Sequence, residues 1–178
     1  QFYDGSPFEP IVNKIGTEHG VKHDLYAEYR EAILSRPPGS ITLYPGVKPV
    51  LERLHAQGTK LGVITSKPRV AQIADRYAGA PQDLLELEIA ELFDTVVGYE
   101  DTTNHKPHPE PVHLALANLS LTPEGSTVVG DTPADIEAGR AAGCQTCLVT
   151  WGATMHRPGD VQADFIAETP DRLLSLLL

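Results

Sequence analysis

The sequence is poor in several features that mark particular protein classes. Its two cysteines among 178 residues are too few for a disulfide framework. Lysine and arginine number 14 against 24 aspartates and glutamates, for a net charge of -10, so there is no basic surface for nucleic acid or for a membrane. No apolar run approaches the length of a membrane span. The length of 178 residues is enough for one compact domain, or one domain with a small appendage.

The two cysteines form a C-x-x-C pattern, Cys144 to Cys147, which raises a redox or zinc interpretation. A zinc site needs a second pair of ligands, and none stands at a suitable spacing. The surrounding stretch, AAGCQTCLVT, is typical of a helix end, a glycine turn and a buried strand. We therefore interpret both cysteines as small buried hydrophobic residues.

The chain changes character at the break RPPGS, residues 36–40. Before the break the spacing of apolar residues predicts helices and no strand. After it, short apolar strands alternate with helices, which is typical of a parallel sheet covered on both faces. We predict an α/β, doubly wound, Rossmann-like core over residues 39–178 and a partial helical cap over residues 1–38. The expected strands are 60–65, 93–98, 126–130 and 146–152, and the expected helices 47–58, 68–79, 82–93, 109–119, 133–143 and 170–178.

Polar residues follow the strands at the edge where such folds place their sites. Thr65 and Ser66 come between a strand and the helix predicted from Pro68, where free backbone N–H groups and a hydroxyl would bind phosphate. A simple helix cap is the alternative. Lys106, in HKPHPEP, is restrained by prolines, and its ammonium would neutralise phosphoryl charge. The alternative is a solvated loop lysine.

Two carboxylates in GDTPAD, Asp131 and Asp135, directly follow the strand 126–130. Helix capping accounts for Asp131 at most, and it leaves the second carboxylate unexplained. Two hard oxygen ligands suit Mg²⁺, so we predict that both residues bind the metal. His105 and His108 are interpreted as polar loop residues, because the acidic pair suits a hard cation better.

The order of these motifs resembles the haloacid dehalogenase superfamily, in its capped phosphatase branch. ITSKP is similar to the second motif of that family, HKPHPEP to the third and VVGDTPADIEAGRAAG to the fourth. The resemblance implies that Thr65 and Ser66 hold the phosphoryl group, that Lys106 stabilises charge, and that Asp131 and Asp135 form part of a magnesium site. Within the family the chain looks most like the phosphoglycolate phosphatase and pyrophosphatase group.

The first motif of the family, D-x-D-G-T after a strand, is absent. The nearest match is FYDGSP, which would put Phe2 at the nucleophile position, so we interpret Gly5 and Pro7 as cap residues. In this family the strand that carries the motif lies in the middle of the sheet. We therefore expect the natural protein to carry about 40 to 50 further N-terminal residues, the length of one strand and one or two helices. The first residue is Gln1 rather than methionine, which agrees with this expectation.

The resulting prediction is a Mg²⁺-dependent phosphate monoester hydrolase that acts on a small phosphorylated metabolite through an aspartyl-phosphate. The nucleophile would lie outside these 178 residues, so the chain alone would be inactive. Alternatives are a pyrophosphatase of the same fold and an inactive protein that binds phosphate or a partner. A dehalogenase fits less well, because Lys106 and the acidic pair favour phosphoryl chemistry. We expect a cytoplasmic protein with no nucleic-acid or membrane partner, and the sequence does not indicate its oligomeric state.

Overall fold

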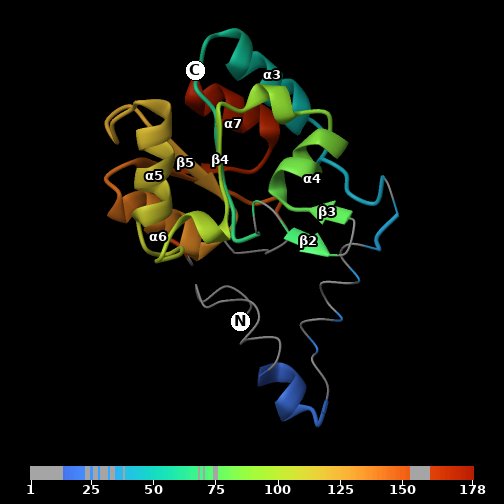
Figure 1. The fold of residues 1–178 in the computed structure, drawn as a ribbon. Helices are drawn as coiled ribbons and strands as arrows, with labels where there is room; N and C mark the ends of the chain where they lie inside the picture. Colours follow the sequence, from blue (N-terminus) through green and yellow to red (C-terminus); the bar gives the residue numbers. More distant parts are fainter. Residues whose placement is uncertain are drawn as a thin grey trace.

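The computed structural model of the chain describes residues 14–22, 25, 28, 32, 35–37, 39–67, 69, 71–73, 76–152 and 161–178. Residues 14–18 of the N-terminal segment are helical, and Figure 1 shows this helix apart from the strands. Residues 25, 28 and 32 are also helical, as the apolar spacing predicted. The FYDGSP stretch, with the predicted cap residues Gly5 and Pro7, lies outside the described residues.

After residue 46 the described residues form helices and short strands, which alternate as predicted except that β1, β2 and β3 follow one another. The elements are α3 (Val47–Ala56), β1 (Gly62–Ile64), β2 (Ala71–Ile73), β3 (Arg76–Ala78), α4 (Ala80–Glu86), η1 (Ala90–Leu92), β4 (Thr95–Val97), η2 (Tyr99–Asp101), α5 (Glu110–Leu119), β5 (Thr127–Gly130), α6 (Pro133–Ala141), β6 (Gln145–Val149), β7 (Phe165–Ala167) and α7 (Pro170–Leu177).

The main strands are parallel and form two groups. β1 pairs with β4, with Val63 opposite Val96, and β5, β6 and β7 form a three-stranded sheet in that order. Helices cover both faces of the larger group. Thr146 and Leu148 of β6 point toward α6, whereas Cys147, which lies between them, points to the opposite face, and α7 packs against the neighbouring strand β7. Figure 1 shows α5 and α6 together on one side of the strands, and α3 packs with α7 on another side. The predicted doubly wound, Rossmann-like fold is confirmed.

The two parallel groups meet at a break in the sheet between β1 and β5, which we call the strand gap. Ile64 of β1 and Val128 of β5 pack against the same hydrophobic cluster of α5 and α6, so the two strands lie under one helical layer. Among the described residues, however, β1 pairs only with β4 and β5 only with β6. Val129, in the middle of β5, is 40% exposed. Interior strands of a parallel sheet are normally buried, so this exposure indicates that the sheet is open at β5.

Three elements differ from the sequence predictions. The helix expected over 68–79 is wrong: β2 and β3 form an antiparallel hairpin there, and Gly79, with φ of 145°, precedes α4 instead of ending a helix. The helix expected over 82–93 stops at Glu86, because Glu88 adopts a left-handed conformation with φ of 55°. β7 was not predicted. Its three residues are too short to show a period, and the apolar spacing of 68–79 fits a helix and a hairpin equally well.

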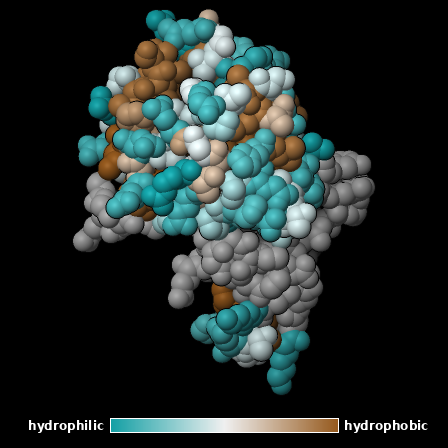
Figure 2. Space-filling view, turned by 90° about the vertical axis from the view of Figure 1, so that its left-hand side faces the viewer, coloured by the Kyte–Doolittle hydropathy of each residue, from teal (hydrophilic) through white to brown (hydrophobic). Residues whose placement is uncertain are grey.

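The surface of the core mixes polar and apolar residues. Figure 2 shows the face on the α5 and α6 side, where hydrophilic residues predominate and hydrophobic areas lie between them. In the described part of the chain, no helix is both long and apolar enough to cross a membrane.

Candidate active site

Lys106 connects the two sides of the strand gap at the carboxyl ends of β1 and β5. Its ammonium Nζ donates a hydrogen bond to the carbonyl oxygen of Ile64, at 3.2 Å, and forms an ion pair with Oδ1 of Asp135, at 2.6 Å. The Lys106 and Asp135 side chains are only 16% and 12% exposed. Lys106 is therefore not a solvated loop lysine, which was the alternative to a functional role.

Asp135 is fixed from its other side by the start of α6. Its Oδ2 accepts hydrogen bonds from the backbone N of Thr132, at 3.1 Å, and from the Thr132 hydroxyl, at 2.6 Å. The Thr132 hydroxyl in turn accepts from the backbone N of Asp135, so the two residues form a capping box. The helix cap is thus Thr132, so capping, the alternative role considered for Asp131, is wrong. The pattern T-P-A-D, with proline at the first helical position, was the sequence signal for this cap.

Two glycines leave the space that the acidic pair occupies. A Cβ atom on Gly130 would overlap the side chain of Asp135, and a Cβ atom on Gly152 would overlap the carboxylate of Asp131. Gly152 follows β6, so the Asp131 side chain lies against the end of the strand next to its own. Neither glycine has a positive φ, and the close approach of a carboxylate is the reason that each position excludes a side chain. The sequence analysis did not identify either glycine as part of the site.

The hydroxyl loop after β1 is stabilised differently from the prediction. The described residues that follow this loop, Ala71–Ile73 and Arg76–Ala78, form strands, so the phosphate-binding helix N-terminus expected here is wrong. The backbone N of Thr65 donates to Val97 and extends the ladder between β1 and β4. The Thr65 hydroxyl accepts a hydrogen bond from the backbone N of Lys67, at 3.1 Å, and Ser66 is exposed. We refer to residues 65–67 as the hydroxyl loop.

A second loop holds the hydroxyl loop in place. The backbone N of Tyr99 donates to the carbonyl oxygen of Lys67, at 3.0 Å, and Glu100 accepts from the backbone N of Arg69, at 2.8 Å. A Cβ atom on Gly98 would overlap the backbone of Arg69, so these two segments of the chain are in close contact. The polar residues after β1 and β4 therefore lie together, as their positions at the strand ends predicted.

His105 and His108 contact residues of their own loop and line a cavity that the acidic pair does not line. The ring of His105 stacks on Tyr99, with centroids 3.8 Å apart, and burial lowers the pKa of His105 despite the opposing charge of Glu110. Nδ1 of His108 accepts from the backbone N of Glu110. Both histidines line an open cavity of about 870 Å³ between this loop and α6, and the cavity is not lined by Lys106 or the two aspartates. We therefore do not assign the cavity to the acidic site.

The acidic pair offers a hard cation only part of a coordination shell. Carboxylate oxygens suit Mg²⁺, and the glycine contact leaves space for the Asp131 carboxylate. Both oxygens of Asp135 already accept from protein donors. Across the described residues, no three histidine, cysteine, aspartate or glutamate side chains converge as a set of metal ligands. The residues present fit Mg²⁺ only as a partial site.

Comparison with known proteins places these motifs in one family. The family model described as haloacid dehalogenase-like hydrolase matches residues 1–149. A phosphoglycolate phosphatase of Salmonella paratyphi A is 41% identical over 112 residues, which are 62% of this chain and 40% of that protein. A phosphoglycolate phosphatase of Shigella boydii is 35% identical over 94% of this chain and 64% of its own length. The pyrophosphatase PpaX of Oceanobacillus iheyensis is 33% identical over 84% and 65%.

Solved structures show the same fold. A predicted phosphoglycolate phosphatase from Haemophilus somnus superposes with a TM-score of 0.71 at 27% identity, and covers 94% of this chain and 74% of its own. A haloacid dehalogenase-like family hydrolase from Streptococcus pneumoniae gives a TM-score of 0.72 at 26% identity, with 98% and 78% coverage. The chain spans less than two thirds of the two phosphoglycolate phosphatases compared above.

Proposed function

We propose that this chain, which belongs to the haloacid dehalogenase-like hydrolase family, forms most of a phosphate monoester hydrolase. The observation that carries the proposal is the position of Lys106. Its ammonium lies between the carboxyl ends of β1 and β5 and is held there by Ile64 and Asp135. A buried cation at the carboxyl edge of a parallel sheet is suited to bind a phosphoryl group.

The chain's own residues would bind and orient the phosphoryl group. The Thr65 hydroxyl and the backbone N of Ser66 would donate hydrogen bonds to its oxygens, and Lys106 would stabilise the charge that develops during transfer. Asp135 would orient the Lys106 ammonium, to which it is paired at 2.6 Å. Asp131, with Asp135 behind it, would hold Mg²⁺, which supplies charge neutralisation at the phosphate.

The nucleophile would come from a strand that occupies the strand gap. Parallel strands lie about 4.8 Å apart, so one more strand between β1 and β5 would pair with both open edges and cover Val129. An aspartate at the carboxyl end of that strand would lie beside Lys106 and Asp131. Attack of its carboxylate on phosphorus would break the P–O bond to the leaving alcohol, which takes up a proton, and water would then hydrolyse the aspartyl-phosphate and release phosphate. We propose that this strand belongs to residues upstream of Gln1, and that residues 1–38 form part of a cap over the site.

The substrate would be a small phosphorylated metabolite. The relatives named phosphoglycolate phosphatase favour a phosphorylated acid, and the relative named pyrophosphatase PpaX makes inorganic pyrophosphate the second candidate. The acidic composition and the absence of a membrane-spanning helix from the described residues agree with a cytoplasmic enzyme, which we also propose.

Phosphate release tests this function. We would compare the 178-residue chain with a longer chain that begins at the upstream start of its natural reading frame, using phosphoglycolate and pyrophosphate with Mg²⁺. The longer chain is expected to turn over one of the two substrates and the 178-residue chain neither. Equal activity in both chains would contradict the strand proposal. Activity in neither would favour a protein that binds phosphate or a partner without catalysis.

A further inference from the structure

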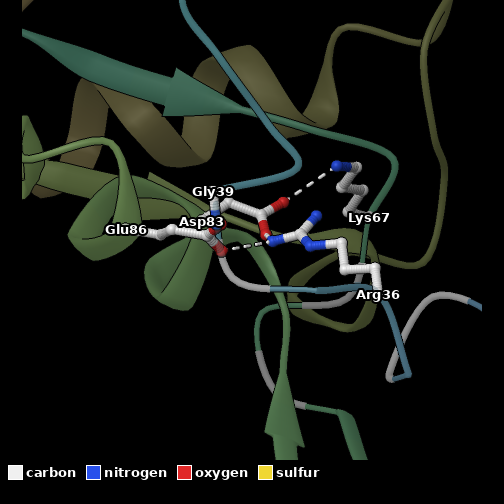
Figure 3. A network of polar contacts seen from close by, with 5 residues as sticks. All are labelled: Arg36, Gly39, Lys67, Asp83 and Glu86. Carbon is white, nitrogen blue, oxygen red and sulfur yellow. Dashed lines mark hydrogen bonds and ion pairs between the residues drawn. The ribbon is translucent and has the colours of Figure 1, made fainter.

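A network of four charged side chains connects the hydroxyl loop to the segment that leads to the N-terminal residues (Figure 3). Asp83, on α4, lies at its centre and uses its two oxygens in different directions. Oδ2 forms an ion pair with Nζ of Lys67, at 2.8 Å, and Oδ1 forms one with Nη2 of Arg36, at 2.6 Å. Lys67 belongs to the hydroxyl loop, and Arg36 belongs to the 36–39 stretch, which we call the linker.

Glu86, one turn further along α4, binds the linker at two points. Its Oε2 pairs with Nη2 of Arg36, at 2.9 Å, and its Oε1 accepts a hydrogen bond from the backbone N of Gly39, at 2.7 Å. Figure 3 shows the end of the Arg36 side chain turned toward the Asp83 and Glu86 carboxylates, both of which pair with Nη2. The linker is therefore attached to α4 through a side chain and through its own backbone.

The central members of the network are shielded from water. Asp83 is 17% exposed and Arg36 24% exposed, so their pairing is screened less than a surface ion pair. Burial alone would raise the pKa of Asp83, but the hydrogen bonds from Lys67 and Arg36 outweigh it and lower that pKa. Two cations and two carboxylates make the network neutral, and the removal of one cation leaves a charge uncompensated.

We propose that Asp83 is a positioning residue that couples the linker to the hydroxyl loop, so that the N-terminal segment and the phosphate site respond to each other. The functional part of this inference rests on the proposed phosphatase activity, in which Thr65 and Ser66 bind phosphate. The physical coupling does not. The Asp83 side chain carries the effect, because its one carboxylate contacts both Arg36 and Lys67.

Two backbone amides report the coupling directly. The amide of Lys67 is bonded to the Thr65 hydroxyl, and the amide of Gly39 is bonded to Glu86, so each exchanges slowly with solvent deuterium only while its own segment is ordered. Neither amide is bonded to Asp83. A change at one amide after a substitution in the other segment therefore has to pass through the network.

The experiment is amide hydrogen exchange on the 178-residue chain and on variants. Arg36→Met is expected to accelerate exchange at Lys67 at least threefold, and Lys67→Met to accelerate exchange at Gly39 by a similar factor. Arg36→Lys, which keeps the charge, is expected to restore part of the protection. Lys60→Met is the matched control, because it removes an ion pair of similar length, 2.7 Å to Asp94, that contacts neither segment. Exchange at Lys67 unchanged in Arg36→Met would overturn the proposal.

A kinetic measurement on the longer, active protein distinguishes failure of the coupling from failure of the function. Asp83→Asn is expected to raise KM about tenfold with kcat changed less than threefold, because it loosens the phosphate-binding loop without removing a reacting group. Turnover with no cross-effect in exchange would refute the coupling alone. The cross-effect without turnover on any phosphate ester would refute the proposed function alone.

Discussion

Replacing Lys106 with methionine tests whether the ion pair across the strand gap is a fixed part of the structure. The substitution keeps most of the apolar stem and removes the charge that pairs with Asp135, at 2.6 Å, and donates to Ile64. Asp135 is then left as a largely buried carboxylate. It still has the two hydrogen bonds from Thr132, so part of its stabilisation remains.

The size of the effect follows from this geometry. Removing one partner of a fully buried pair costs about 3–5 kcal/mol. Because both side chains keep some exposure and Asp135 keeps its two donors, we expect Lys106→Met to lower the free energy of unfolding by about 2–3 kcal/mol. Asp135→Asn keeps one oxygen that accepts from Thr132 and replaces the oxygen that faces Lys106 with an NH₂ group, which removes the ion pair. The interaction energy of the two substitutions should be about 2 kcal/mol.

The assay is a double-mutant cycle from urea unfolding, with equal m-values as the check that the unfolded states are comparable. The control cycle is the pair of Lys48 and Glu88, which are 3.4 Å apart and 37% and 83% exposed, and it should give an interaction energy close to zero. An interaction energy for Lys106 and Asp135 that is no larger than the control would refute the reasoning. Lys106 would then not be held in the position on which the proposed function depends.

Three further predictions concern other parts of the core. Gly152→Ala displaces the Asp131 carboxylate, so the Mg²⁺ concentration for half-maximal activity of the longer chain should rise at least tenfold, and an unchanged value would contradict this. Burial raises the pKa of the Cys144 and Cys147 thiols, so neither should react with a disulfide reagent at pH 7.5 until urea is added. Fast labelling of the folded chain, or one zinc ion bound per chain, would contradict the interpretation of both cysteines as buried hydrophobic residues. Hydrogen bonds from Thr146 lower the pKa of Asp164 in the folded chain, so the stability that this carboxylate contributes is present above its unfolded pKa and lost as pH falls through its folded pKa. Asp164→Asn should therefore reduce the loss of unfolding free energy between pH 5 and 3, and a pH profile identical to that of the wild type would contradict this.

The sequence predicted the fold where a pattern extended over enough residues. Ten-residue helices such as α5, and apolar strands that end in glycine such as β5, have spacings that fit one structure. The hairpin of β2 and β3 has three residues in each strand, which is too short for the two-residue period to be distinguished from a helical turn. The end of α4 depends on the conformation of Glu88, which composition does not reveal.

The candidate site was predictable in its members and not in its contacts. Lys106 and Asp135 were expected to converge because parallel strands bring their carboxyl ends to one edge. The role of Asp135 as partner of both Thr132 and Lys106 required the geometry of the capping box. The contact of Arg36 with Asp83 joins residues 47 positions apart, and no local pattern indicates a pair at that separation.

The central claim is that the acidic pair serves Mg²⁺-dependent phosphate transfer. The most direct measurement is the rate of phosphate release by the longer chain, with phosphoglycolate and with pyrophosphate, for the wild type and for Asp131→Asn. We predict turnover that needs Mg²⁺, stops with a chelator and falls at least a hundredfold in Asp131→Asn while the fold is retained. Wild-type turnover in Asp131→Asn, or turnover that is unaffected by the chelator, would contradict the account.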